Sequence, residues 1–451
     1  ILLKKSCDNW VPHQSWKHGN TSVPSAATKT VWPQQVWRIR SEPGGLAMFI
    51  RSKQARRGKT GDLSLLERRE AQVVHEAPED QDQAVSHGGG EMEALMAIFC
   101  SKMMILLIFV PLGLFAERLG LNSAMIFTFN FMAIVPLASI LGAATESMAS
   151  HTGEMIGGLL NATFGNAVEM IMCMQAVKAG LVEVVQGNLL GSVLSNLLLV
   201  LGMAIFCAGL KFHNRQFNAV GAAANMSCLV VASISICLPT LFGQIADTGD
   251  EVLMISRLCS LFLSLVYFLF LYFQLGTHAY LFVDDGAEGE AEEEAHLSVA
   301  GSACLLILCT LVVAGCSENL VDSIEGVSTK YGLPKAFIGV ILLPIVGNAA
   351  EHATAVTSAY RGKLDLAIGV SVGSSTQIAL FVVPVAVLSG WYFGTPMSLN
   401  FRVFDMACQM LSVFLVSQVT QHGNTNWLHG AMLVTTYVLI AIMTWFIPER
   451  T

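Results

Sequence analysis

Two short segments of the chain carry the same chemically active side chains. Gly165–Glu169 reads GNAVE and Gly347–Glu351 reads GNAAE, and the two segments are 182 residues apart. The same offset relates further residues downstream: Gly180 with Gly362, Gly187 with Gly369, and Gly191-Ser192 with Gly373-Ser374. Agreement at one offset over this distance is typical of an internal repeat. In each copy an Asn precedes a Glu by three residues, so both side chains share one face of a helix.

The side chains of the repeated motif offer oxygen atoms as ligands. The candidates are the carboxylates of Glu169 and Glu351, the amides of Asn166, Asn348 and Gln377, and the hydroxyls of Ser192, Ser195, Ser374 and Ser375. Oxygen ligands of this kind are those that Ca²⁺ prefers, with Mn²⁺ as the second candidate. The motif contains no thiolate, which disfavours Zn²⁺ and Cu⁺. Two carboxylates would match the charge of one divalent cation.

Both glutamates lie in apolar surroundings without a base close by in the sequence. Neither Glu169 nor Glu351 has a Lys or Arg within seven residues. A charge at the centre of a bilayer costs at least roughly 2.5 to 3.5 kcal/mol, and removal from water favours the protonated form of a carboxyl. We therefore expect a cation or a proton to neutralise each acid. Competition between the two for one site would couple their movements, and since no P-loop is present, an ion gradient is the expected energy source.

His352 directly follows Glu351, whereas the first repeat has Met170 at the equivalent position. A histidine titrates near neutral pH, so His352 is a candidate proton relay. The alternative is a neutral histidine that is hydrogen-bonded within the helix bundle.

The spacing of the motif predicts how its residues are positioned. Glu169 and Gly191 are 22 residues apart with Gly180 midway. If Gly180 is the turn between two helices, each arm of 11 residues spans roughly 16 Å, about half of a 30 Å hydrocarbon core. Glu169 and the Gly191-Ser192 segment would then lie at the same depth near the midplane, and the same reasoning applies around Gly362. Each repeat would build half of one buried polar site.

The composition requires a membrane protein. Of 451 residues, 53% are hydrophobic and 13% charged, about half the charged fraction of ordinary soluble domains. Of the 25 Lys and Arg residues, 13 lie between Lys4 and Arg69, which leaves few bases in the remainder and excludes a nucleic-acid binder. The 11 cysteines lie mostly in apolar stretches without Cys-x-x-Cys spacing, as expected of buried hydrophobic side chains.

We expect an all-α polytopic membrane protein with about eleven transmembrane helices. The predicted spans are 96–116, 122–143, 155–177, 182–210, 217–241, 252–277, 297–318, 333–359, 364–391, 398–418 and 427–447. The two Glu-bearing spans are then the third and the eighth. A shift by five spans, an odd number, makes the repeats antiparallel, which is the inverted-repeat plan of secondary transporters.

Two polar regions divide the chain. Residues 1–95 are expected to be a disordered, regulatory cytosolic tail, or a segment with an unnatural start, because the chain begins with Ile1 and not Met. Residues 284–296 begin with seven acids in eleven positions, and they are expected to be an acidic cytosolic linker. That linker is either a solvated hinge or a loop that gathers cations. Four further acids lie near predicted span ends: Glu146, Glu154, Asp322 and Glu325. They either line an entry path for ions or are ordinary solvent-exposed loop residues.

From about residue 96 to its end, the chain resembles the cation/proton exchanger family of Ca²⁺/H⁺ antiporters, within the Ca²⁺/cation antiporter superfamily. The resemblance rests on Gly165–Glu169, on Gly347–His352 with Gly373–Gln377, and on the acidic stretch at 284–294. It implies a first helix at 96–120 outside a ten-helix core, with one five-helix repeat at 121–283 and a second, inverted repeat at 297–451.

The resemblance also implies a function. Cytosolic Ca²⁺ would be exchanged by alternating access for protons from an acidic store, such as a vacuole. Glu169 and Glu351 would be the ion-binding acids, with Asn166, Asn348 and Gln377 near them. Ca²⁺ and H⁺ are then transported ions, and no cofactor is expected. The protein would be embedded in the lipid bilayer, as a monomer or as a homo-oligomer.

Three alternatives stay open at this point. A Na⁺/Ca²⁺ exchanger would require Na⁺, and a passive channel could not accumulate Ca²⁺ uphill. An intramembrane hydrolase would use Ser374 or Ser375 with His352, but it would not require a Glu-centred motif twice.

Overall fold

The computed structural model describes residues 88–212, 215–246, 248–281 and 297–448. All described residues lie within one compact unit, Val85–Thr451. Most of the expected tail and the acidic linker lie outside the described residues. Residues 88–95, at the end of the expected tail, are helical and begin α3.

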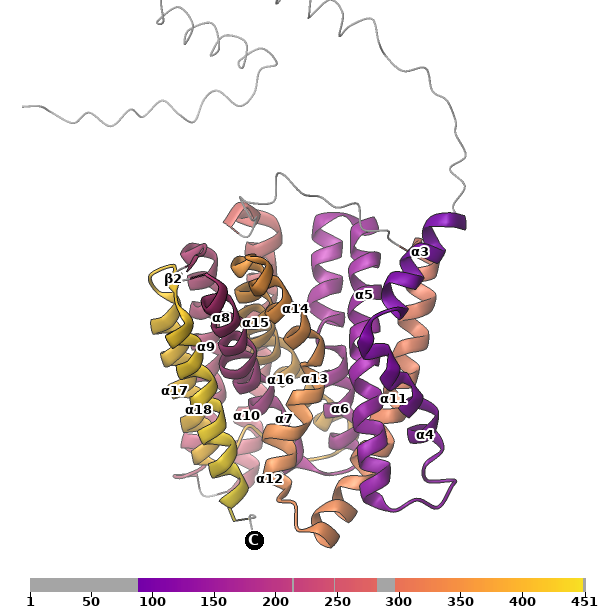
Figure 1. The fold of residues 1–451 in the computed structure, drawn as a ribbon. Helices are drawn as coiled ribbons and strands as arrows, with labels where there is room; N and C mark the ends of the chain where they lie inside the picture. Colours follow the sequence, from indigo (N-terminus) through magenta and orange to yellow (C-terminus); the bar gives the residue numbers. More distant parts are fainter. Residues whose placement is uncertain (1–87, 213–214, 247, 282–296, 449–451) are drawn as a thin grey trace, which may run out of the picture. The chain divides into compact units, whose positions relative to one another are not determined.

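The described chain is almost entirely helical (Figure 1). Its first half contains α3 (Gly88–Phe99), η2 (Lys102–Ile108), α4 (Phe109–Phe115), α5 (Ser123–Phe164), α6 (Ala167–Lys178), α7 (Val182–Leu194), η3 (Ser195–Val200), α8 (Leu201–Lys211), α9 (Ala219–Phe242), α10 (Gly249–Leu271), η4 (Tyr272–Thr277) and η5 (Ala279–Leu281). Its second half contains α11 (Val299–Tyr331), α12 (Lys335–Phe337), η6 (Ile338–Leu342), α13 (Leu343–Gly347), α14 (Ala349–Arg361), α15 (Leu364–Gln377), η7 (Ile378–Val382), α16 (Val383–Phe393), α17 (Val403–Thr420) and α18 (Trp427–Phe446). Two short strands, β1 (Arg215–Gln216) and β2 (Asn424–Thr425), pair antiparallel with Arg215 opposite Thr425.

Several long helices begin at a polar side chain that satisfies free backbone amides. The side-chain oxygen of Asn122 accepts a hydrogen bond from Met125 N before α5, and Ser298 does the same for Gly301 N before α11. Asn218 and Asn426 cap α9 and α18 in the same way. The first amides of a helix have no partner within it, so these cap side chains stabilise the start of each helix. Each cap therefore marks the point where a polar connection ends and an apolar span begins.

Eight described helices are long and apolar enough to cross a membrane, and ten segments qualify when each of two bent pairs counts as one span. The bent pairs are Gly90–Phe99 with Lys102–Phe115 and Lys335–Gly347 with Ala349–Arg361. The predicted span 155–177 does not form one helix, because α5 ends at Phe164 and α6 begins at Ala167. The predicted count of eleven therefore stays a prediction, whereas the all-helical polytopic class is confirmed.

The sequence repeat is also a structural repeat. At the offset of 182 residues, α6 corresponds to α14 and α7 to α15, and the bounds of α8 and α16 agree residue for residue. Gly180 and Gly362 both adopt a positive φ, 75° and 93°, in the turn between the paired helices. Glycine adopts this conformation without a steric penalty, which explains its place at both turns. A π-helical segment, η3 or η7, follows the second helix of each pair.

The two repeats run in opposite directions across the bundle. The span Val182–Lys211 begins at the Gly180 turn, and at its far end Lys211 Nζ donates to Tyr360 O, 3.0 Å, beside the Gly362 turn. The span Leu364–Phe393 begins at that turn. At its other end Thr395 Oγ1 donates to Val177 O, 3.1 Å, beside the Gly180 turn. The two turns therefore lie at opposite ends of the bundle, as inverted repeats require (Figure 1).

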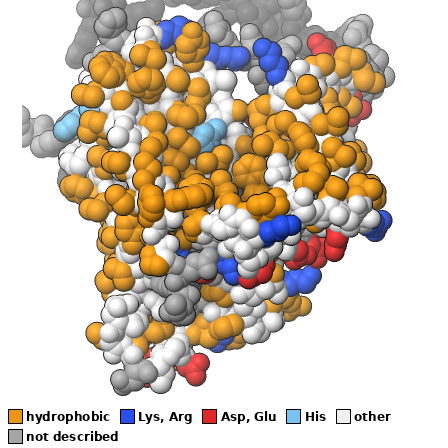
Figure 2. Space-filling view, turned by 60° about the horizontal axis from the view of Figure 1, so that its bottom comes forward, with side chains coloured by type: hydrophobic (Ala, Val, Ile, Leu, Met, Phe, Trp, Pro, Cys, Tyr) orange, Lys and Arg blue, Asp and Glu red, His pale blue; other side chains and the backbone are white. Residues whose placement is uncertain are grey.

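The two repeats approach each other at backbone distance. A Cβ on Gly187 would lie 3.2 Å from the backbone of Gly339, and one on Gly191 would overlap Val340 O. Small residues permit this close contact between helices within a bilayer. The flank of the bundle is largely apolar (Figure 2), with exposed side chains such as Phe262, Leu311 and Phe414 on helices suited to face lipid.

Candidate functional site

Glu169 lies in the first turn of α6, directly after a helix break. Asn166 at the break has φ −109° and ψ 22°, outside the helical region. The side chain of Glu169 is only 1% exposed, and a Cβ on Gly347 would lie 3.0 Å from its Oε1. The carboxylate of the first repeat therefore lies against the helix break of the second repeat.

Glu351 occupies the equivalent place in the first turn of α14. It follows a break at Asn348, which has φ −86° and ψ 17°. Its Oε2 atom is buried without a hydrogen-bond partner among the described residues. Both acids therefore lie beside the helix break of the second repeat, Glu169 against Gly347 and Glu351 four residues after that glycine. That the two acids bind one ion stays a prediction.

The amides and hydroxyls expected near the acids form hydrogen bonds between the repeats. Asn166 Nδ2 donates to Gln377 Oε1, 2.7 Å, and Ser374 Oγ donates to Asn166 Oδ1, 3.1 Å. In the reciprocal direction, Asn348 Nδ2 donates to Ser192 O, 3.1 Å. Ser192 contributes its backbone carbonyl to this contact, while its own hydroxyl has no partner among the described residues.

Asn196 is a central member of this cluster that sequence reasoning missed. It is fully buried at the start of η3, and its Nδ2 donates to Ser374 Oγ, 3.0 Å, and more weakly to Asn348 Oδ1, 3.4 Å. The offset of 182 residues aligns Asn196 with Ile378, so the repeat gave no signal for it. The sequence does contain one indication of Asn196, because this polar residue follows Ser195 directly and precedes a run of apolar residues.

Several buried oxygen atoms of the cluster have no hydrogen-bond partner within the described chain. They are Glu169 Oε1 and Oε2, Glu351 Oε2, Ser192 Oγ and Asn196 Oδ1. Buried polar atoms are normally paired, so such a group of free acceptors indicates a place for a bound cation or proton. The described residues contain no group of three or more His, Cys, Asp and Glu suited to a metal ion. Neutral amide, hydroxyl and carbonyl oxygens would therefore have to complete the coordination.

His352 lies beside the site and is partly buried. Its Nδ1 is 2.9 Å from Asn348 O, and because a carbonyl only accepts, Nδ1 carries the proton. Its Nε2 is buried without a partner in the described structure. The ring is therefore held by the same Asn that forms the helix break, with one nitrogen left to accept a proton.

Ser375 Oγ is hydrogen-bonded within its own helix, α15. It donates to Ser371 O, 2.9 Å, one helical turn earlier. Neither Ser375 nor Ser374 is hydrogen-bonded to His352 in the described structure.

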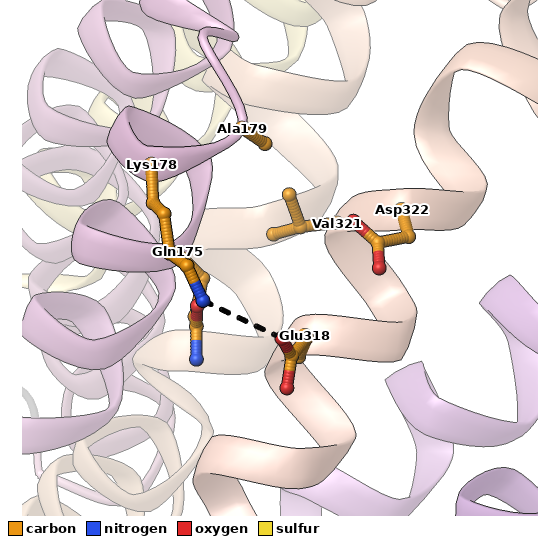
Figure 3. A pocket seen from close by; sticks show the side chains of 6 residues that line it. All are labelled: Gln175, Lys178, Ala179, Glu318, Val321 and Asp322. Atoms are coloured by element: carbon orange, nitrogen blue, oxygen red, sulfur yellow. Dashed lines mark ion pairs between the residues drawn. The ribbon is translucent and has the colours of Figure 1, made fainter. Parts of the chain in front are cut away.

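The four acids expected near an entry path have different surroundings. Asp322 lines a cavity of about 130 Å³ together with Gln175, Lys178, Ala179, Glu318 and Val321 (Figure 3). Lys178 Nζ lies 3.8 Å from Glu318 Oε1 across this cavity. Glu325 instead pairs with Lys335, 2.7 Å, and Glu146 is exposed. The side chain of Glu154 lies outside the described set.

Comparison with known proteins identifies the family. The model of the sodium/calcium exchanger protein family matches residues 122–276 and 301–446. A Ca²⁺/H⁺ antiporter of Synechocystis sp. is 43% identical over 363 residues, which cover 76% of this chain and 97% of the relative. A vacuolar calcium ion transporter of Schizosaccharomyces pombe is 39% identical over 349 residues, which cover 76% and 85%.

Solved structures agree with this assignment. Native YfkE has a TM-score of 0.68 and 37% identity, and the match covers 76% of this chain and 100% of that one. The H⁺/Ca²⁺ exchanger CAX shares the fold, with a TM-score of 0.57 at 13% identity over 80% of this chain and 90% of that one. The resemblance expected from the repeated motif is therefore confirmed, and the chain belongs to the sodium/calcium exchanger protein family.

Proposed function

We propose that this chain is a secondary antiporter that exchanges Ca²⁺ for protons, with Glu169 and Glu351 holding either the metal ion or protons. The observation that carries the proposal is a pair of carboxylates, one from each inverted repeat, of which Glu169 is buried and Glu351 is partly buried with its Oε2 atom inaccessible. Neither takes part in an ion pair among the described residues. Relatives at 43% and 41% identity are named a Ca²⁺/H⁺ antiporter and a vacuolar cation/proton exchanger, which supports these two ions.

Competition at the two acids would couple the ion movements. A Ca²⁺ ion bound between both carboxylates neutralises them, and protonation of both removes the charge that attracts the metal. Each proton that descends one pH unit releases about 1.36 kcal/mol. Two protons that cross two pH units therefore supply roughly 5.4 kcal/mol, which sustains about a ten-thousand-fold gradient of a divalent ion.

The neutral members of the cluster would supply the remaining ligands. We assign this role to Asn166, Asn348, Gln377, Ser192 and Ser374, and we place His352 in proton transfer. The amide oxygens and hydroxyls are hard ligands, so Ca²⁺ is the expected ion and Mn²⁺ the second candidate. No cofactor is needed in this scheme, because Ca²⁺ and H⁺ are the transported ions.

The hydrolase alternative lacks its geometry. A serine nucleophile needs a hydrogen bond to its general base. Ser374 is instead bonded to Asn166 and Asn196, and Ser375 to its own helix. The family comprises transporters, so this protein is a secondary transporter and not an enzyme.

The surroundings of the protein are proposed on the same basis. It is a multi-pass membrane protein, and vacuolar names among relatives support an acidic endomembrane such as the vacuole. We further propose that residues 1–95 are a regulatory cytosolic tail, that 284–296 is a cytosolic linker between the repeats, and that a homo-oligomer is compatible with the fold.

Radioactive Ca²⁺ uptake into sealed vesicles with an acidic interior tests the proposal. Wild type is expected to accumulate Ca²⁺ uphill without Na⁺, and Glu169→Gln and Glu351→Gln are each expected to abolish that uptake. Glu251→Gln changes an exposed acid in the first turn of α10 and should transport as wild type does. Proton-driven uptake retained in both site variants would overturn the assignment, a requirement for Na⁺ would favour a Na⁺/Ca²⁺ exchanger, and leakage without accumulation would favour a channel.

A further inference from the structure

A single arginine lies within an otherwise uncharged stretch of a spanning helix. Arg257 belongs to the span Gly249–Thr277, and no other charged residue occurs between Val252 and Thr277. Its side chain is partly buried, and its Nε atom is buried without a hydrogen-bond partner in the described structure. An ionisable side chain inside a membrane span is costly and requires a partner.

The described elements that surround α10 supply no acid to pair with Arg257. The elements that pack most closely against α10 are α9, α16, η4 and η7. None of the four contains an Asp or Glu. On α10 itself, the acids Asp250 and Glu251 lie about two turns away, roughly 10 Å along the helix, and neither forms an ion pair among the described residues.

Within the described part of the chain, the guanidinium of Arg257 contacts an aromatic ring. The Arg257 Cζ atom lies 4.8 Å from the centroid of the Trp391 ring, near the end of α16. A ring on the face of a guanidinium leaves the N–H groups on its edge free to donate. Those donors match the paired oxygens of a phosphate group, which guanidinium binds in a bidentate manner.

The neighbouring residues indicate where this arginine lies relative to the bilayer. Trp391 is 55% exposed and the adjacent Tyr392 is 86% exposed, and such aromatic side chains gather at the membrane interface. Arg257 follows the start of the span at Gly249 by about 12 Å of helix. Helical side chains point toward the N-terminus, so a long arginine side chain reaches back toward the headgroup level.

We propose that Arg257 and Trp391 form a binding site for the phosphate group of a membrane phospholipid. The phosphate would supply the counter-charge that the described residues packed around Arg257 do not. The acyl chains would lie along the exposed apolar face of α10, which includes Met254, Leu258 and Phe262. This site is separate from the acids Glu169 and Glu351, and it does not depend on which ions are transported.

Native mass spectrometry of the delipidated full chain in mild detergent tests the proposal. Wild type should bind phosphatidylglycerol about tenfold more tightly than a diacylglycerol glycolipid without phosphate. Arg257→Gln should weaken phosphatidylglycerol binding by about tenfold, and Arg257→Lys by less, because lysine keeps the charge but loses the bidentate geometry. Arg118→Gln is the matched control, since Arg118 is exposed and lies over the ring of Phe115 at 5.7 Å.

Each of these binding measurements has a result that would contradict the proposed phospholipid site. Equal binding of both lipids by wild type would do so even if Arg257→Gln does not fold. Unchanged phosphatidylglycerol binding by a folded Arg257→Gln, or an equal loss in Arg118→Gln, would also do so. Millimolar inorganic phosphate should leave the lipid bound, and its displacement by inorganic phosphate would assign the site to free phosphate in place of a lipid.

Discussion

At the scale of single residues, the site joins two carboxylates to neutral groups that are hydrogen-bonded across the repeats. Both oxygens of Glu169 lack a hydrogen-bond partner in the described part of the chain, whereas Asn166, Gln377 and Ser374 bond to one another. A bound cation would therefore replace missing contacts of the acids and would not have to break a salt bridge. The same free oxygens can accept protons, which is the physical basis of the proposed exchange.

Asn196 is predicted to hold the neutral ligands in place. Substitution of Asn196 by Leu removes the donor to Ser374 Oγ and Asn348 Oδ1 at nearly constant volume. We expect the apparent Ca²⁺ affinity to fall by about tenfold, equivalent to about 1.4 kcal/mol, in vesicle uptake at varied Ca²⁺. Asn225→Leu replaces another buried Asn, in the second turn of α9, and should keep the wild-type affinity. Equal affinities in all three proteins would show that Asn196 has no such role.

His352 offers a separate prediction about protons. In His352→Asn, the side-chain amide can still donate to Asn348 O, but the atom corresponding to Nε2 is lost. We expect the maximal rate of proton-driven uptake to fall several-fold, because a proton acceptor beside Glu351 is missing. Equilibrium Ca²⁺ binding should be unchanged. A normal rate over the whole pH range would leave His352 as a structural residue only.

The repeat allowed most of the site to be predicted from the sequence. It brought Glu169, Glu351, Asn166 and Asn348 together, because each residue recurs at one offset. It could not find Asn196, whose counterpart is apolar. It also could not tell that Ser375 turns back to its own helix, since neighbouring serines differ by about 100° in direction around the axis.

At the scale of elements, equivalent glycines have different packing. A Cβ on Gly191 would overlap Val340 O and contact Pro344 at 2.7 Å, whereas nothing lies within 4 Å of a Cβ on its counterpart Gly373. We therefore expect Gly191→Ala to destabilise the protein by about 1 to 3 kcal/mol through overpacking. Gly373→Ala should be close to neutral. Thermal unfolding in detergent measures both, and equal melting temperatures would contradict the observed contact between α7 and η6.

The helix breaks also explain where span prediction failed. Hydropathy predicted one span at 155–177, but Gly165 and Asn166 interrupt it. Further upstream, Gly153 has a φ of 77° within α5. Apolar composition indicates that a segment enters the bilayer, whereas a local break depends on backbone dihedrals and on the partner that fills the gap. Here that partner is the other repeat.

At the scale of the whole molecule, the opposite direction of the repeats places the two turns on opposite sides of the membrane. We expect Ala179→Cys and Lys363→Cys, each in a background without native cysteines, to react with a membrane-impermeant maleimide from opposite sides of sealed vesicles. Both positions are exposed beside their turns. Labelling of both from one side would rule out the inverted arrangement. Loop charges alone could not predict it, because basic residues are roughly balanced between the two ends.

One pair of membrane-embedded acids, Glu169 and Glu351, is proposed to serve both transported ions. The most direct measurement is the number of protons released for each Ca²⁺ bound by the purified protein in weakly buffered solution. We expect wild type to release protons on binding Ca²⁺ at acidic pH, approaching two per ion, with fewer released in Glu169→Gln and in Glu351→Gln. Tight Ca²⁺ binding by wild type without any proton release across the acidic range would contradict the account.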